Sequence, residues 1–108
     1  TVVAPTWRGG VPGVRWERRT YRPGDLAGAF LAVAATDDRA VNRQVGEEAR
    51  ALGIPVSVAD CREECSFFFP AVCEGGGVTA GLVSRGGRDH GRTARAARAV
   101  RKTLEGLE

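Results

Sequence analysis

Asp60 is the residue whose type and position best suit proton transfer. It directly follows residues 54–59, a mostly apolar run with the length of a buried strand. In open parallel sheets, ligands bind beyond the carboxyl ends of the strands. A carboxylate there can be partly desolvated, which favours proton transfer near neutral pH. We therefore predict that Asp60 is a general base, and capping of the following turn is the alternative.

Two more segments should deliver side chains to the same edge of the sheet. Pro5 and Thr6 follow a β-branched run at the start of the sequence, and Thr36, Asp37 and Asp38 follow a second apolar run. Capping and the helix dipole both favour Asp in the first turn of a helix. We therefore interpret Asp37 and Asp38 first as helix-capping residues and only second as site residues.

The three cysteines and the single histidine are the residues from which a metal site could be assembled. They are Cys61, Cys65, Cys73 and His90. The spacing C-x3-C-x7-C is not a standard zinc or iron–sulfur pattern, and the histidine lies far away in sequence. An odd number of cysteines in a short chain fits reduced thiols better than disulfides. We expect packing thiols here, with metal binding as the alternative.

A glycine-rich segment matches the letters of a dinucleotide-binding fingerprint. Residues 75–80 read G-G-G-V-T-A, which fits G-x-G-x-x-A. The fingerprint must follow a strand and open a helix, whereas this segment opens a β-branched run. We predict instead a hairpin turn that joins strands over residues 67–72 and 78–84.

The elements that must position Asp60 alternate between strand and helix. Residues 30–35 form a continuous apolar run, typical of a strand covered on both faces of a parallel sheet. A helix should follow to about Leu52, because it has an apolar face and Gly53 can stop it. That face comprises Val41, Val45, Ala49 and Leu52. With the strand over residues 54–59, this makes a right-handed strand–helix–strand unit and an α/β domain with a parallel sheet.

The two ends of the sequence carry different signals. Residues 1–5 read as the end of a strand, and residues 14–18 alternate like a short edge strand. After a boundary near Phe69, the hairpin is followed by a helix rich in Ala and Arg over residues 93–104. Strands joined by a tight turn do not extend a strand–helix–strand series, so a different kind of segment begins there.

Composition and charge limit the classes of protein that fit. The chain has 108 residues, 43% of them hydrophobic, which suits one compact domain with a tail. It has neither an apolar run long enough for a membrane span nor a secretory leader, so we expect a cytoplasmic protein. From Arg85 onward, seven Arg or Lys face three Asp or Glu, which suits a polyanionic partner. No aromatic residues interleave with this basic helix, so we expect no nucleic acid partner.

Three stretches of the chain resemble the siroheme synthase family. They are VVAP at residues 2–5, AATDD with VNR at residues 34–43, and VSVAD with CSFFFPA at residues 56–71. The family's typical strings are VVAP, AATDD-x-x-VN, and NVVD followed by C-x-F-x-F-P-A. The matches occur in the same order and cover nearly the whole chain, which makes chance resemblance a poor explanation.

The resemblance implies NAD-dependent dehydrogenation of precorrin-2 to sirohydrochlorin, followed in many members by insertion of ferrous iron (ferrochelatase activity). It implies a Rossmann-like, NAD-binding domain, incomplete at its amino terminus, over residues 1–66 and a dimerisation segment over residues 67–108. Asp60 matches the family's essential aspartate. The resemblance also places two pairs of residues beside the cofactor: Pro5 and Thr6, and Thr36 and Asp37.

The resemblance also predicts a homodimer that handles a substrate with many carboxylates. We expect Arg85, Arg88 or Arg92 of one chain to reach Asp60 of the other and to bind substrate there, and we predict Ser84 as a further substrate-binding residue. The interface should form mainly after Phe69, because the hairpin and its helix leave several apolar side chains with little local sheet to cover them. These are Phe67, Phe69, Val72, Leu82, Val83, Val100 and Leu104.

The chain departs from the family pattern in two places. The family's G-x-G-x-x-A loop, with its strand, would precede Thr1. Where members typically read S-[ST]-x-G-x-S-P, residues 84–90 read S-R-G-G-R-D-H, which weakens the case for iron insertion. The alternative hypothesis is a non-catalytic tetrapyrrole- or metal-binding module that lacks the cofactor loop.

Overall fold

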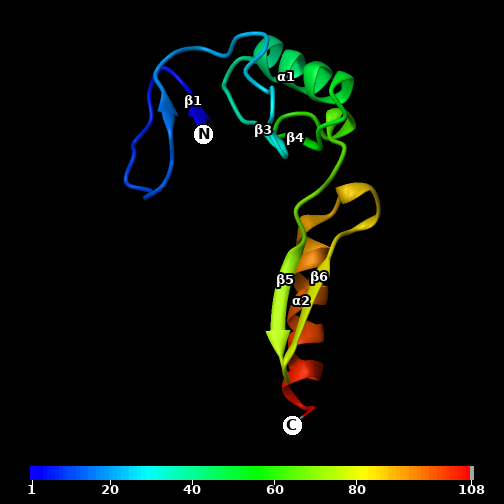
Figure 1. The fold of residues 1–108 in the computed structure, drawn as a ribbon. Helices are drawn as coiled ribbons and strands as arrows, with labels where there is room; N and C mark the ends of the chain where they lie inside the picture. The colour runs from blue at the N-terminus through cyan, green and yellow to red at the C-terminus, as the bar shows by residue number, and fades with distance from the viewer. Residues whose placement is uncertain (108) are drawn as a thin grey trace.

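The computed structural model describes residues 1–107 as three two-stranded sheets and two long helices (Figure 1). One parallel pair is β1 (Val2–Val3) with β2 (Trp16–Glu17), and a second is β3 (Ala32–Ala34) with β4 (Val56–Val58). The antiparallel pair is β5 (Ala71–Gly75) with β6 (Val78–Leu82). The helices are α1 (Arg39–Ala51) and α2 (His90–Glu105), and short 3-10 turns span Arg62–Glu64 and Arg85–Gly87.

The β3–α1–β4 unit confirms the predicted strand–helix–strand connection. β3 and β4 run parallel, with Ala32 opposite Val56 and Ala34 opposite Val58. The apolar face of α1 packs on this pair through Val45 and other side chains. The buried core comprises Leu26, Ala32, Ala34, Val45, Ala49, Val56 and Val58. This arrangement makes the amino-terminal two thirds of the chain α/β in class.

Both ends of α1 follow the predicted signals. Asp38 is the N-cap, and its Oδ1 accepts hydrogen bonds from the amides of Ala40 (2.9 Å) and Val41 (3.4 Å). At the other end Gly53 has φ +70°, a conformation that side chains with a Cβ rarely adopt. Leu52 was wrongly assigned to the apolar face, since it lies past the last turn of α1 and is 57% exposed.

The prediction that β3 is covered on both faces is wrong. Ala32 and Ala34 face α1 and are buried, but Val33, on the other face, is 52% exposed. Phe30 is 87% exposed and lies outside the strand. The physical reason is that α1 covers only one face of β3, and within residues 1–107 no other element packs on the opposite face.

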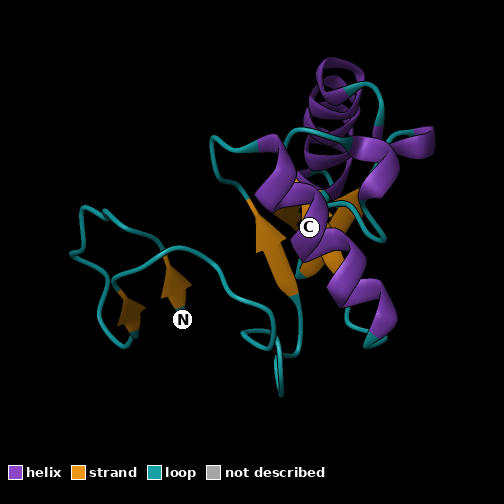
Figure 2. Cartoon of the chain, turned by 90° about the horizontal axis from the view of Figure 1, so that it is seen from above, coloured by secondary structure: helices purple, strands orange, loops and turns teal. Residues whose placement is uncertain are grey.

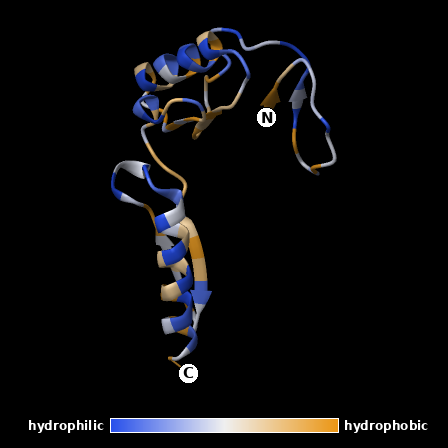
Figure 3. Ribbon diagram, turned by 180° about the vertical axis from the view of Figure 1, so that it is seen from behind, coloured by the Kyte–Doolittle hydropathy of each residue, from blue (hydrophilic) through white to orange (hydrophobic). Residues whose placement is uncertain are grey.

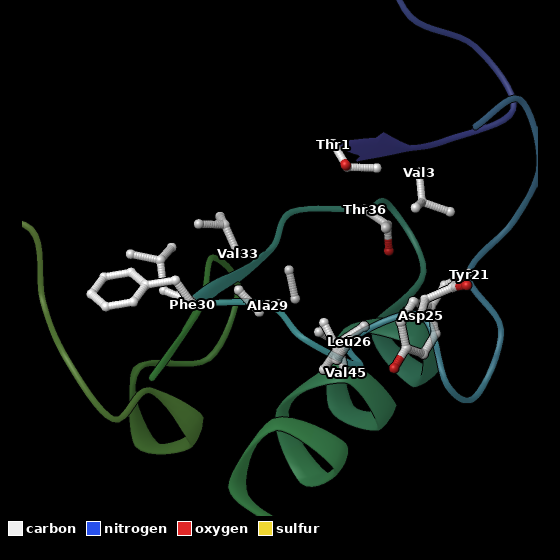
Figure 4. A pocket seen from close by; sticks show the side chains of 13 residues that line it. Thr1, Val3, Tyr21, Asp25, Leu26, Ala29, Phe30, Val33, Thr36 and Val45 are labelled. Carbon is white, nitrogen blue, oxygen red and sulfur yellow. The ribbon is translucent and has the colours of Figure 1, made fainter. Parts of the chain in front are cut away.

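The predicted parallel sheet is present as two separate pairs, because β1 and β3 are not hydrogen-bonded to each other. A cavity of about 410 Å³ lies between them, with Thr1 and Val3 on one side and Leu26, Ala29 and Val45 on the other (Figure 4). Adjacent strands must approach to about 4.8 Å to pair, and β1 and β3 instead lie on either side of this cavity. Each strand therefore pairs only on its far side, with β2 and β4 respectively.

The hairpin and α2 form the carboxyl-terminal third, and their boundaries differ from the prediction. Residues 67–70 are irregular, because Pro70 has no amide to donate to a strand ladder, so β5 begins at Ala71. The hairpin turn at Gly76 and Gly77 is confirmed, and it excludes the dinucleotide fingerprint at residues 75–80. α2 begins at His90 rather than Thr93, since Asp89 Oδ1 accepts from the amide of Arg92 at 2.9 Å.

The molecule is elongated. Its radius of gyration is 17.0 Å, against about 13 Å for a compact domain of this length. Figure 1 shows the hairpin and α2 projecting from the α1 unit, and Figure 2, seen from above, shows the two strands near the N-terminus standing apart from the rest. Figure 3 shows hydrophilic residues along the length of α2 and more hydrophobic ones on the strand beside it. No helix within residues 1–107 is long and apolar enough to cross a membrane.

Candidate functional site

Asp60 lines a cavity of about 390 Å³ at the carboxyl end of β4. One wall consists of residues 59–63, which follow β4, and the other consists of Gly87, Arg88 and His90, which lead into α2. The cavity therefore lies at the junction between the α1 unit and the hairpin–helix segment. We call it the Asp60 cavity.

Arg39 holds the carboxylate of Asp60. Its Nη1 donates to Asp60 Oδ1 at 2.7 Å, and its Nη2 pairs with Glu64. The Asp60 side chain is 40% exposed, and its ion pair with Arg39 holds the carboxylate at the cavity. Burial lowers the pKa of Arg39, but the attraction of the two carboxylates outweighs burial and raises the pKa above its usual value. Arg39 is therefore a permanent cation beside Asp60.

The four predicted cofactor residues are not gathered at one place. Pro5 and Thr6 are exposed after β1, and Asp37 is exposed after β3. Only Thr36 lines the cavity between β1 and β3. Its polar groups are engaged by Asn42, which is fully buried.

Asn42 fixes the turn after β3 from inside the protein. Its Oδ1 accepts from the Thr36 amide at 3.0 Å and from the Thr36 hydroxyl at 2.7 Å. Its Nδ2 donates to the Thr36 carbonyl at 3.0 Å. The prediction missed this role, although an Asn inside a helix, where its intrinsic preference is poor, is a signal that the side chain bonds elsewhere.

The residues described do not form a pyrophosphate site. Such a site needs free backbone amides at a helix N-terminus. Both long helices begin at an N-cap aspartate, Asp38 for α1 and Asp89 for α2, whose carboxylate accepts from the helix amides. A carboxylate thus occupies the position that a phosphate would take, and it would repel one. Within residues 1–107, the groups beside Thr36 fit at most the uncharged part of a dinucleotide.

Of the predicted substrate residues, only Arg88 lines the Asp60 cavity, and it does so within its own chain. The Ser84 hydroxyl accepts from the Asp89 amide at 2.9 Å, so it shapes the start of α2. Arg85 and Arg92 are exposed and lie outside the cavity lining. We had predicted that these basic side chains reach Asp60 of a partner, whereas Arg88 and Asp60 here come from one chain.

The cysteines act separately from one another. The thiol of Cys65 bonds to the backbone of β4. Its Sγ accepts from the Val58 amide at 3.1 Å and donates to the Val58 carbonyl at 3.3 Å. Cys73 is buried in β5, and Cys61 lines the Asp60 cavity. Within residues 1–107, no group of three His, Cys, Asp or Glu side chains could hold a metal ion.

Two residues of the site were not predicted. Arg39 lies 21 residues from Asp60, and nothing in the sequence links the two. His90 was considered only as a metal ligand, yet it lines the Asp60 cavity beside Arg88. Its position one residue after the helix-capping Asp89 could have placed it at a helix start.

Comparison with known proteins gives the family. Residues 1–71 match a family described as "Putative NAD(P)-binding". The chain is 43% identical over 89 residues to the "Probable multifunctional siroheme biosynthesis protein HemA" of Ruminiclostridium josui, covering 82% of this chain and 17% of that protein. It is 45% identical over 74 residues to the siroheme synthase of Methylococcus capsulatus, covering 68% and 15% respectively.

A third relative matches a larger share of this chain. The siroheme synthase of Photorhabdus laumondii is 37% identical over 94 residues, which is 87% of this chain and 19% of that protein. The chain thus spans less than a fifth of the length of these three relatives. On these matches, the chain belongs to this NAD(P)-binding family and is a member of the siroheme synthase family.

Proposed function

We propose that this chain forms the dehydrogenase site of an enzyme of siroheme biosynthesis, which oxidises precorrin-2 to sirohydrochlorin with NAD as the acceptor. The observation that carries this proposal is the Asp60 cavity, in which an aspartate at the end of a parallel strand faces a cationic wall. The relatives named as siroheme synthases support the substrate class.

Asp60 would act as the base in this reaction. Arg39 occupies Oδ1, and no other hydrogen bond reaches this carboxylate from residues 1–107, which leaves Oδ2 free to accept a proton from the substrate. A general base must approach the proton within hydrogen-bond reach, and Asp60 lines a cavity that would receive a ring edge of the substrate. Arg88, on the opposite wall, would bind a substrate carboxylate.

The cavity between β1 and β3 supports a Rossmann-like assembly around this site. Within residues 1–107, β1 and β3 each have an unpaired edge beside this cavity. A further parallel strand placed there would join the β1–β2 and β3–β4 pairs into one sheet. A helix N-terminus after such a strand could supply the amides for a pyrophosphate. We propose this strand as part of the full-length protein, with Thr36 at the neighbouring strand end.

We propose two further properties, which concern iron insertion and the location of the protein. Iron insertion would use the same cavity, with ferrous iron as a substrate and Asp60 taking one of the two protons that the macrocycle releases. A cytoplasmic location is supported by three free cysteines, since a reducing compartment keeps thiols unpaired.

The test uses the full-length protein with precorrin-2 and either NAD or NADP. We expect absorbance of the reduced nicotinamide at 340 nm to rise in proportion to the sirohydrochlorin formed, and to rise faster with NAD. Tetrapyrrole binding without any reduction of NAD or NADP would contradict the proposal. That result would favour the non-catalytic binding module instead.

A further inference from the structure

The Asp60 cavity contains a titratable side chain that the proposed reaction does not use. His90 is the only histidine of the chain and the first residue of α2. It lines the cavity together with Arg88, on the wall opposite Asp60. Asp89 lies between them in sequence, but its carboxylate accepts from the Arg92 amide and is engaged in capping the helix.

The two walls of this cavity differ in how their charges are balanced. On the β4 side, Asp60 is paired with Arg39, and Glu63 is paired with Arg62 at 3.5 Å. On the α2 side, Arg88 makes no ion pair with any residue in 1–107. Arg88 is therefore a cation of the cavity lining without an acidic partner, and it lies two residues before His90.

The titratable and charged groups that line the cavity with His90, or adjoin it in sequence, come from both walls. From the β4 wall they are Asp60, Cys61, Arg62 and Glu63, and from its own segment Arg88 and Asp89. Asp60 shares Arg39 with Glu64, and Glu63 is paired with Arg62. Protonation of the imidazole would thus place a second cation beside Arg88, at a position open to a ligand.

We propose that His90 and Arg88 together bind one carboxylate of the tetrapyrrole, and that His90 makes this binding depend on pH. The inference rests on the proposed function for the substrate class. Imidazole ordinarily changes charge between about pH 5 and 8, where the carboxylates of the ligand stay ionised. A protonated imidazole gives a charge-assisted hydrogen bond to a carboxylate, whereas a neutral one gives a weaker bond.

The experiment measures binding of an eight-carboxylate porphyrin, uroporphyrin, to the 108-residue chain by fluorescence titration. For the natural sequence we expect the Kd to rise about tenfold between about pH 6 and about pH 8.5. In His90→Gln the Kd should be weak at both values, and in His90→Lys it should be tight at both. Arg101→Gln, near the far end of α2, is the control and should keep the pH dependence of the natural sequence.

Two results would overturn the proposal. One is an equal pH dependence in the natural sequence and His90→Gln, and the other is His90→Lys binding as weakly as His90→Gln. If either variant fails to fold, the imidazole NMR signals of the single histidine are followed as uroporphyrin is added. They should shift at saturation, and unchanged signals would also refute the proposal. None of these readouts involves NAD, so failure of the dehydrogenase assignment and failure of this proposal are distinguishable.

Discussion

Arg39 Nη1 donates to Asp60 Oδ1 over 2.7 Å and so joins the first residue of α1 to the turn that follows β4. Because α1 follows β3 after a short turn, this ion pair connects the segments that follow two neighbouring parallel strands. It orients the carboxylate while leaving its second oxygen free. Arg39 is thus a positioning residue for Asp60, and its loss should affect the reaction more than the fold.

Arg39→Gln should lower kcat of the dehydrogenase about 10- to 100-fold, because Asp60 would lose its fixed orientation. The urea midpoint of unfolding should change little, since the pair is partly exposed. Arg43→Gln breaks an exposed pair with Glu47 on the same helix and is the matched control. Equal kcat in the two variants would show that Arg39 has no positioning role.

Asn42→Ala should destabilise the fold by about 2–3 kcal/mol, measured by urea unfolding. The substitution leaves the Thr36 amide and carbonyl without the partner that they have in the protein. Asn42→Asp should cost at least as much, because a carboxylate cannot donate to the Thr36 carbonyl. A change below about 0.5 kcal/mol in both variants would mean that water replaces the side chain.

Asp25 should contribute stability that disappears in acid. Arg19 donates to both of its oxygens at 2.8 Å, and the Arg22 amide donates to it at 2.8 Å. The hydrogen bonds from Arg19, and then that from Arg22, lower the pKa of Asp25 to about 2. Because the folded pKa lies below its ordinary value near 4, this contribution is complete above pH 4 and is lost as the pH falls through about 2.

The measurement for Asp25 compares Asp25→Asn with the natural sequence by urea unfolding at about pH 6 and about pH 2. The variant should be less stable by about 1–2 kcal/mol at the higher pH. The difference should shrink at the lower pH, where about half of the natural carboxyl groups are also neutral. A difference that stays constant with pH would mean that charge plays no part in this contact.

Val72→Glu should weaken the proposed homodimer. Val72, Val83 and Phe69 are 55%, 57% and 62% exposed, although all are apolar and lie in or beside the hairpin. Exposed apolar groups of this kind mark protein–protein contacts. Sedimentation at micromolar concentration should show a dimer for the natural sequence and a shift to monomer for Val72→Glu. Leu52→Glu, at an equally exposed site near α1, should leave the dimer intact, and a natural sequence that is monomeric would refute the proposal.

Local signals in the sequence were sufficient to predict where helices and strands lie, but not which residues pack on them. Asp38 and Gly53 predicted where α1 begins and ends, because helix capping and a positive φ depend on only a few neighbouring residues. The exposure of Val33 depends on what packs on β3, which no local pattern contains. The Arg39–Asp60 pair joins exposed charges far apart in sequence, and such pairs follow only from the tertiary arrangement.

The most direct test of the central claim is the precorrin-2-dependent reduction of NAD by full-length protein carrying Asp60→Asn. Asparagine keeps the size of the side chain but cannot accept the proton as a carboxylate does. The rate should fall about 100-fold or more, with an unchanged unfolding midpoint, while Glu47→Gln on the exposed side of α1 keeps the natural rate. An Asp60→Asn variant that reduces NAD as fast as the natural protein would contradict the account.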